Sequence, residues 1–413
     1  MTRPAEIAVL GALVVFGLLV RLYGLTSYGI WWDEAYHVAL VRLPTVGSMV
    51  DAVLSNPPSD PLYVLLLRPW TALLGTTDGS VRLLSVIFST ATVLATYALG
   101  RVVAGRRAAL LGTGLLAVSP YAVELGQEAA LYALAGLTTP VALAAGWHWR
   151  RSGRGALAYV LCGAVAIYSH YVVAAILALF AVLALTPTAG PARVGRSAWI
   201  IAHAAIATIW LPWLAALALH WTAASVPRAT LPHRVAPDEV LGALVQFTSG
   251  SAALLQGRRP LEAAGLIAGA GLIALGWYAG AAAARRGLRL LLVISALIFL
   301  VPAMLSAVTG LWLFVPHFML FLLPALCVIL AAGAWAVVPG LLVATRAARP
   351  VVPALLGTAL LLVWLGAQAW GLVLYHRYPP HGADGLRELA AQLHRERAAA
   401  EPVLIMPAVL TPP

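Results

Sequence analysis

The sequence lacks lysine and contains few charged residues of either sign. Charged side chains make up 10% of its 413 residues and hydrophobic ones 62%, whereas soluble proteins carry about 25% charged residues. All 26 basic residues are therefore arginines, and together with 15 acidic residues they give a formal net charge of +11. The shortage of charge excludes an ordinary soluble domain. A mean hydropathy of +0.91 is instead typical of a chain that crosses a membrane many times.

Cysteine is almost absent as well. The only two cysteines, Cys162 and Cys327, both fall inside apolar runs. We therefore expect neither a disulfide framework nor a zinc site.

Long apolar runs, by contrast, are abundant. Eleven of them predict membrane-spanning helices, at about 6–23, 81–100, 107–121, 129–147, 156–169, 171–186, 198–221, 261–283, 290–309, 313–337 and 351–375. The run 156–186 could be one tilted helix, but its polar "YSHY" would be costly in lipid, so two helices are predicted. The sequence thus predicts an all-α integral membrane protein of about eleven spans.

The segment between the first two runs, residues 24–80, contains no clean span. "YHVALVRLPTVGSMVDAVL" is amphipathic, and "PLYVLLLRPWTALLG" is apolar but short and interrupted by Arg68. We expect both to form helices that lie along the membrane surface.

The distribution of arginine predicts the orientation. If the N-terminus lies in the cytoplasm, the inner segments are "RVVAGRR", "RRSGR", "PARVGR", "ARRGLR" and "TRAAR", and with Arg3 they hold 14 arginines and one acid, Glu6. This is the positive-inside pattern, and it explains the basic excess without nucleic acid. The domain boundaries expected are a membrane domain over 1–375, with outer loops at 24–80 and 222–260, and a short extracytoplasmic tail over 376–413.

Polar residues that could take part in catalysis or binding lie on the predicted outer side. Asp33 and Glu34 follow the first span in "GIWWDEAYH", and "SNPPSDPLY", "SPYAVELGQEAALYAL", "YSHY" and "FVPHFMLFLLPAL" come later. A carboxylate there could act as a general base on a hydroxyl, and nearby arginine or histidine could hold a phosphate. The alternatives stay open: Asp33 and Glu34 could cap a surface helix, and His170 could be a packed polar residue.

This succession of motifs resembles the polytopic glycosyltransferases of the GT-C superfamily, in the branch of the protein O-mannosyltransferases and the lipid A aminoarabinose transferase. The resemblance covers nearly the whole chain. It implies transfer of a sugar, such as mannose, from a polyprenyl phosphate to an acceptor hydroxyl on the outer face, with inversion. Asp33 matches the family's catalytic base, and Glu34 would support it.

The same resemblance implies residues that bind the donor, its phosphate or the acceptor. The matched positions are Asp60, Tyr63, Gln127, Glu128, Tyr132, His170, Tyr171 and His317. This chain departs from the family pattern where His-Pro becomes Ser59-Asp60 and where Ala130 and His317 replace arginines. The arginines that could take over phosphate binding are Arg68, Arg82, Arg258 and Arg259.

The resemblance further implies a bacterial plasma membrane, a polyprenyl-phosphate sugar as donor, a lipid, glycan or protein as acceptor, and no nucleic acid. A divalent cation, Mg²⁺ or Mn²⁺, stays open, given Asp33, Glu34, Asp60, Glu128 and His170. Hard cations such as Mg²⁺ favour oxygen ligands, and no motif has metal-ligand spacing. Two other functions also stay open. A transporter or flippase would place ionisable groups near the bilayer midplane and show repeated halves, whereas a cell-envelope scaffold would need no catalytic acid.

Overall fold

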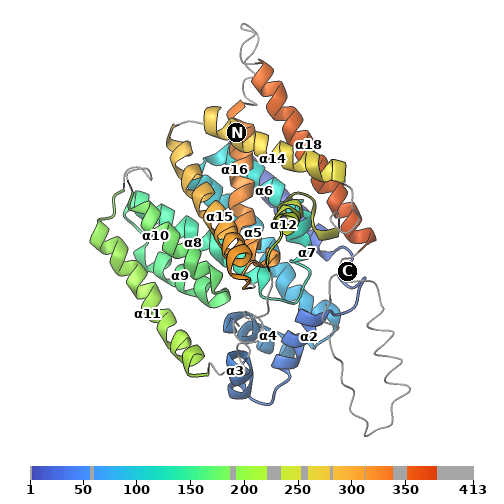
Figure 1. Cartoon of the computed structure of the whole chain (residues 1–413), viewed down its shortest axis with the longest axis vertical. Helices are drawn as coiled ribbons and strands as arrows, with labels where there is room; N and C mark the ends of the chain where they lie inside the picture. Colours follow the sequence, from blue (N-terminus) through green and yellow to red (C-terminus); the bar gives the residue numbers. More distant parts are fainter. Residues whose placement is uncertain are drawn as a thin grey trace.

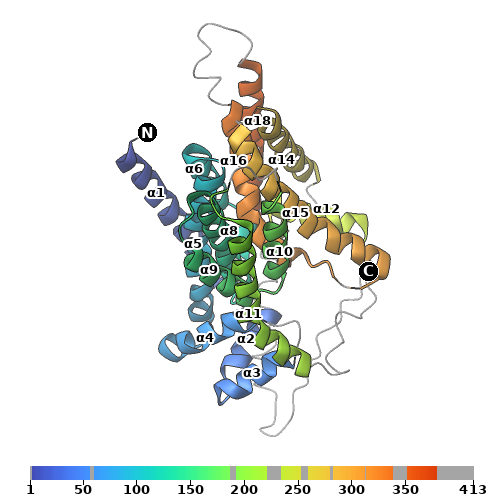
Figure 2. The same cartoon turned by 90° about the vertical axis from the view of Figure 1, so that its left-hand side faces the viewer.

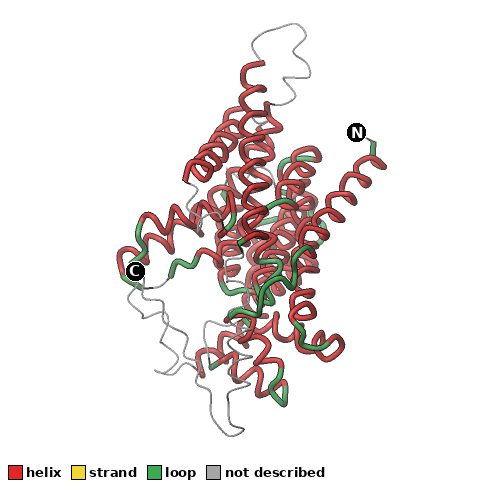
Figure 3. Tube along the Cα trace, turned by 90° about the vertical axis from the view of Figure 1, so that its right-hand side faces the viewer, coloured by secondary structure: helices red, strands yellow, loops and turns green. Residues whose placement is uncertain are grey.

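The computed structural model describes residues 2–55, 60–186, 192–220, 234–252, 259–279, 282–311, 313–337 and 351–378. Within these residues, all regular elements are helices (Figure 3). The long helices are α1 (Arg3–Leu22), α5 (Asp78–Val103), α8 (Tyr132–Ser152), α11 (Arg196–His220), α14 (Arg259–Ala279), α15 (Ala282–Thr309), α16 (Leu323–Val337) and α18 (Val351–Arg377). The shorter ones are α2 (Trp32–Val41), α3 (Val46–Leu54), α4 (Pro61–Leu74), α6 (Arg106–Ala117), α7 (Pro120–Glu124), α9 (Ala156–Ser169), α10 (Val172–Ala184), α12 (Pro237–Ser249) and the 3₁₀ helix η3 (Pro316–Leu322).

Each of the eleven predicted apolar runs contains a helix, which confirms the all-α membrane fold. Seven helices in the described part of the chain are long and apolar enough to cross a membrane. The count of eleven spans therefore stays a prediction. The run 156–186 is divided into α9 and α10, because His170 and Tyr171 separate the two helices.

The predicted surface segments form α2, α3 and α4. One helix, α12, lies inside the predicted outer loop 222–260 and was not predicted. Its start carries a usable signal, because Pro237 occupies the first helical turn and Asp238 and Glu239 follow it, which is the usual composition of a helix N-terminus.

The helices differ in how much of their surface they bury, and this decides which ones can face lipid. Only 17% of the residues in the apolar windows of α1 and α11 are buried, against 78% in the window Pro316–Ala336, which contains α16. α5 packs against α1, α6 and α8, and α16 packs against α6 and α14. We infer that α5 and α16 form the centre of the bundle and that α1 and α11 expose apolar side chains to lipid.

The two ends of the bundle differ in composition. The N-terminus lies at the upper end in both views, whereas α2, α3 and α4 lie at the lower end (Figures 1 and 2). At the upper end the arginine-rich connections meet, since the backbone N–H of Arg193 donates to the Arg150 carbonyl at 2.9 Å. Arg151 Nη1 donates to the Val102 carbonyl at 2.6 Å. The basic loops are therefore gathered at the end opposite α2.

Helices α14 and α16 touch backbone to backbone at Gly333. A Cβ atom built on this residue would lie 1.8 Å from the carbonyl oxygen of Leu272. Only glycine fits such an approach, which is a common device for packing helices in membranes. Gly366 on α18, in contrast, has no atom within 4 Å of a built Cβ.

We expect Gly333→Ala to destabilise the protein by about 1–3 kcal/mol, because α14 and α16 must separate to admit the methyl group. Gly366→Ala is the matched control and should leave the melting temperature unchanged or slightly higher. Thermal unfolding of the two purified variants measures this difference. Equal melting temperatures would show that the close approach at Gly333 does not limit packing.

Candidate active site at the α2 end

The site is built on the first turn of α2, where two neighbouring carboxylates have different surroundings. Successive residues of a helix point about 100° apart, so Asp33 and Glu34 cannot share one environment. Asp33 is half-buried, whereas Glu34 is fully buried. The same helical turn therefore presents one carboxylate to the surface and one to the interior.

Glu34 forms a buried, bidentate ion pair with Arg82 of α5. Arg82 Nε donates to Oε1 and Nη2 donates to Oε2, both at 2.7 Å. The backbone N–H groups of Ala129 and Trp31 also donate to this carboxylate, at 2.9 and 3.2 Å. Four donors thus surround the Glu34 carboxylate, so the geometry supports a positioning role rather than the predicted catalytic one.

The Arg82 guanidinium is also fully bonded. It donates to the carbonyl oxygens of Leu25, Tyr28 and Gly29 at 2.8–2.9 Å, and it lies 4.1 Å from the centre of the Tyr28 ring. Arg82 therefore joins α2 and α5 to the segment after α1. Its proposed use in phosphate binding does not fit this arrangement, because its donors are used inside the protein.

Asp33 keeps a freer carboxylate. Its Oδ2 accepts a hydrogen bond from the Tyr132 hydroxyl at 2.9 Å, the one such bond found for this side chain in the described part of the chain. The Tyr132 ring meets His317 of η3 edge-on, with ring centres 5.1 Å apart. Tyr132 of α8 thus links α2, through Asp33, to η3, through His317.

The α9–α10 turn extends this cluster. The His170 ring lies 4.8 Å from Phe318 and is stacked on Tyr171 at 4.7 Å. Its Nδ1 accepts from the backbone N–H of Val172 at 3.2 Å, which places the ring proton on Nε2. Burial, together with the neighbouring His317, lowers the pKa of His170 to about 3. His170 is therefore a neutral hydrogen-bonding group at physiological pH.

Asp60 precedes α4 and contributes a second, very different carboxyl group. It is 6% exposed, and its Oδ2 has no hydrogen-bond partner in the described part of the chain. Burial raises the pKa of Asp60 to about 8, although a backbone hydrogen bond from Tyr171 opposes this rise. Asp60 therefore stays mostly protonated at neutral pH.

Three predicted binding residues have their polar atoms engaged inside the protein. Tyr63 shares a hydrogen bond with Ser85 at 2.9 Å. Arg68 donates to the carbonyls of Leu43 and Pro44 just after α2, at 2.8 and 3.1 Å, so it caps that helix end. These contacts favour structural roles over the predicted ones.

Gln127 is the third. It accepts from the Tyr375 hydroxyl at 2.7 Å and donates to the Arg21 and Tyr23 carbonyls at 2.8 Å. Its contacts tie the end of α1 to α18. Of the remaining predictions, Glu128 is buried, Arg258 lies outside the described residues, and so does the side chain of Arg259.

Two residues near the site were not predicted to belong to it. His37 stands one helical turn after Asp33, and its buried ring lies 5.3 Å from Tyr63. Burial lowers the pKa of His37, and Asp33 partly opposes this effect. The i, i+4 spacing of Asp33 and His37 was the available signal.

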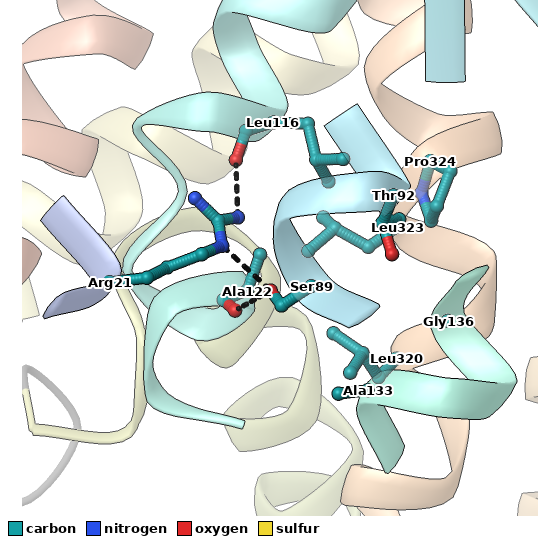
Figure 4. A pocket seen from close by; sticks show the side chains of 10 residues that line it. All are labelled: Arg21, Ser89, Thr92, Leu116, Ala122, Ala133, Gly136, Leu320, Leu323 and Pro324. Carbon is teal, nitrogen blue, oxygen red and sulfur yellow. Dashed lines mark hydrogen bonds between the residues drawn. The ribbon is translucent and has the colours of Figure 1, made fainter. Parts of the chain in front are cut away.

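Arg21 is the other unpredicted feature, and it lies deeper in the bundle. Figure 4 shows its guanidinium reaching the end of α6, where it donates to the Leu116 carbonyl at 3.5 Å. It also donates to the Ala117 carbonyl at 3.2 Å and to Ser89 of α5 at 2.7 Å. A small void lies beside it. Because these contacts satisfy the last carbonyls of α6, Arg21 is a structural cap and not part of the site.

A metal site is not formed by the described residues. Among them, no group of three or more histidine, cysteine, aspartate or glutamate side chains lies close enough to hold an ion. Glu34, one of the predicted ligands, is bonded to Arg82 and to Ala129. The divalent cation therefore stays a prediction, and we assign no chemical step to it.

Comparison with known proteins supports the assignment made from the motifs. Residues 56–215 match the family model of dolichyl-phosphate-mannose-protein mannosyltransferases. ArnT from Cupriavidus metallidurans, solved bound to undecaprenyl phosphate, aligns with a TM-score of 0.59 over 97% of this chain and 82% of that chain, at 14% identity. The chain has the GT-C fold. No curated protein matches its sequence.

Two further solved structures share this GT-C fold. The oligosaccharyltransferase of Archaeoglobus fulgidus, tethered with an acceptor peptide, aligns with a TM-score of 0.61 at 16% identity, over 96% of this chain and 58% of that chain. Arabinofuranosyltransferase AftD from Mycobacteria aligns with a TM-score of 0.51 at 15% identity, over 96% of this chain and 29% of that chain. These likenesses confirm the predicted GT-C fold, and together with the family-model match over residues 56–215 they support the predicted glycosyltransferase class.

The buried ion pair gives a first testable consequence for this GT-C chain. Arg82→Gln should lower stability by about 3–5 kcal/mol, because Glu34 would remain buried without its cation. Adding Glu34→Gln to Arg82→Gln should recover part of that loss, since no unpaired charge remains. Denaturant unfolding of the wild type and the three variants forms a double-mutant cycle. Strict additivity would show that the pair is not coupled.

Asp60 gives a second consequence, which concerns pH. Its pKa in the folded protein, about 8, lies above the value near 3.9 of an unfolded chain. Folding therefore favours the protonated form, and stability is lost as the pH rises from about 4 to 8. Asp60→Asn should remove this loss and raise the melting temperature at pH 8 by a few degrees (roughly 1 kcal/mol or more per pKa unit), with no gain at pH 4. An increase in melting temperature of the same size at pH 4 and pH 8 would contradict a raised pKa of Asp60.

Proposed function

We propose that the chain transfers a sugar, such as mannose, from a polyprenyl-phosphate donor to an acceptor hydroxyl, with inversion, and that Asp33 is the base. The observation that carries this proposal is the contrast between the two carboxylates of α2. Glu34 is surrounded by four donors, whereas Asp33 is half-exposed and holds one hydrogen bond, from Tyr132. A base must reach a proton outside the protein, and only Asp33 of this pair can do so.

The reaction needs one proton acceptor and one leaving group. As the acceptor oxygen attacks the anomeric carbon, its proton passes to the free carboxylate oxygen of Asp33. The bond from that carbon to the phosphate oxygen breaks on the opposite face, and its electron pair stays on the lipid phosphate. Attack opposite to the leaving group inverts the anomeric centre. The hydrogen bond from Tyr132 holds the Asp33 carboxylate in place during this step.

The phosphate must be held without the arginines typical of the family. Arg68 and Arg82 are bonded within the protein, so they do not replace the residues at the Ala130 and His317 positions. Two half-buried side chains of the described site carry suitable polar groups: His317 beside Tyr132, and Tyr171 beside Asp60. We propose that these two side chains, with Arg258 and Arg259, bind the phosphate.

The proposed orientation places this site on the outer face of the membrane. Helix α2, whose first turn carries Asp33, lies at the end of the bundle away from the N-terminus (Figure 1), and Asp33 is linked there to Tyr132 and through it to His317. If those loops face the cytoplasm, a lipid-linked sugar in the outer leaflet meets an aqueous acceptor at Asp33. A transporter is less favoured, since the site lies at one end of the helices and not at their middle.

Asp33→Asn should reduce sugar transfer by at least about a hundredfold, because the amide keeps the size of the side chain but cannot take a proton. Asp51→Asn, which changes an exposed acid on neighbouring α3, is the matched control and should keep full activity. Membranes containing each variant would be supplied with radiolabelled polyprenyl-phosphate mannose, followed by other donor sugars.

Transfer unchanged by Asp33→Asn would remove Asp33 from catalysis but leave the enzyme class intact. No transfer by the wild type with any polyprenyl-phosphate sugar would instead favour the scaffold or transporter functions.

A further inference from the structure

The predicted inner segments of the chain contain many arginines and few acidic residues to neutralise them. The inner segments 101–107, 150–154, 191–196 and 284–289 contain eleven arginines and no acidic residue. Glu6 of α1 reaches this end of the molecule, where its carboxylate pairs with Arg101 at 3.0 Å and with Arg106 at 2.5 Å. The one acid of this end is therefore already shared by two arginines of the α5–α6 connection.

A second arginine group, Arg151 and Arg286, lies where α5, α8 and α15 meet, and neither residue takes part in an ion pair within the described part of the chain. Arg151, in the last turn of α8, donates to the Val102 carbonyl at 2.6 Å and covers the Trp147 ring at 5.1 Å. Gly287 brings α15 against this junction, since a Cβ built on it would lie 2.8 Å from Val103. Arg286 immediately precedes Gly287 and is exposed. Two guanidiniums from different helices thus flank one tightly packed junction.

The electrostatics of this junction favour an anion. A Cβ built on Gly287 would lie 3.1 Å from Trp147 of α8, so the packing of α15 brings Arg286 to the end of α8 that carries Arg151. In keeping with this, burial and the Arg286 guanidinium both lower the pKa of Arg151. Both side chains also stand near the start of α15, where the partial positive charge of the helix N-terminus adds to theirs. An anion placed between them would relieve both effects.

The exposed side chains that follow these arginines along α15 indicate which kind of molecule would supply the anion. Arg286 and Arg289 share one face of α15 with Val293, Leu297 and Leu300, which follow at helical spacing and are 41%, 37% and 48% exposed. A charged head above a continuous apolar stripe fits a molecule with an anionic headgroup and acyl chains. Free phosphate would use the arginines but not the stripe.

We propose that Arg151 and Arg286 form a binding site for the phosphate of an anionic phospholipid, whose acyl chain lies along the exposed face of α15. The site is at the opposite end of the molecule from Asp33, and the proposal does not depend on sugar transfer. Basic pockets between helices at the cytoplasmic surface are a known means of lipid recognition. Here the occupant would stabilise the junction of α5, α8 and α15.

The test is lipid binding to the full-length chain, measured by native mass spectrometry in detergent, with phosphatidylglycerol, cardiolipin and phosphatidylcholine as probes. The variant Arg151→Gln/Arg286→Gln should weaken binding of the anionic lipids roughly tenfold or more, at a few-fold for each arginine lost. Arg154→Gln/Arg196→Gln is the matched control. It removes the same charge from the same end of the molecule, at two exposed residues, and should change binding less than about threefold.

Three results would overturn the proposal. Equal weakening by both double variants would mean a diffuse basic surface instead of a site. Equal binding of phosphatidylcholine would remove the role of the anion, and competition by millimolar inorganic phosphate would assign the site to a free anion. If the double variant does not fold, Arg286→Gln alone, at an exposed side chain, is expected to give about a fivefold loss, and no loss would count against the site.

Discussion

The ion pair between Glu34 and Arg82 is the interaction on which the candidate site depends. Removing two charges from water costs several kcal/mol for each ion, and only good geometry and further hydrogen bonds offset that cost. Both conditions hold, because the pair is bidentate and the backbone satisfies the remaining atoms. An ion pair of this kind is a weak source of stability but a strong constraint on position. It fixes the first turn of α2 against α5 and the segment before α8.

That constraint gives two adjacent carboxylates different tasks. Because Glu34 is held inward, the helix must turn Asp33 toward the surface, where Tyr132 orients it. Asp60 adds a third kind of carboxyl group, buried and mostly protonated, at the start of α4. The cluster is completed by histidines that carry no charge when buried, such as His170. The site therefore contains one available carboxylate within a largely neutral surrounding, which suits a base that must act beside a phosphate.

Much of the fold could be predicted from the sequence, because apolar runs of sufficient length have few alternatives to a membrane helix. The division at His170 was predicted because the polar "YSHY" would be costly in lipid. The helices α2–α4 were predicted as surface helices because their segments are amphipathic, or short and interrupted by Arg68. The pairing of Glu34 with Arg82 could not be predicted, since the two residues are 48 positions apart and nothing local specifies their contact. The same limit applies to Gln127 and Arg68. Their residue types suggested ligand binding, but their polar atoms bond to other parts of the protein, and only the fold reveals those partners. α12 was missed because its 13 residues are too few for a membrane span and include polar side chains such as Asp238, Glu239 and Gln246.

The most direct test of this account is the rate of sugar transfer by Arg82→Lys. Lysine keeps the positive charge but cannot make the bidentate contact that sets the angle of α2. If the ion pair positions Asp33, kcat should fall about tenfold or more, while KM for the polyprenyl-phosphate donor stays within about twofold. The melting temperature should fall as well, because lysine leaves some of the buried acceptors of Arg82 unpaired, so the rates are compared at a temperature at which both proteins are folded. An unchanged kcat would contradict the central claim, because Asp33 would then act without the geometry that Glu34 and Arg82 impose.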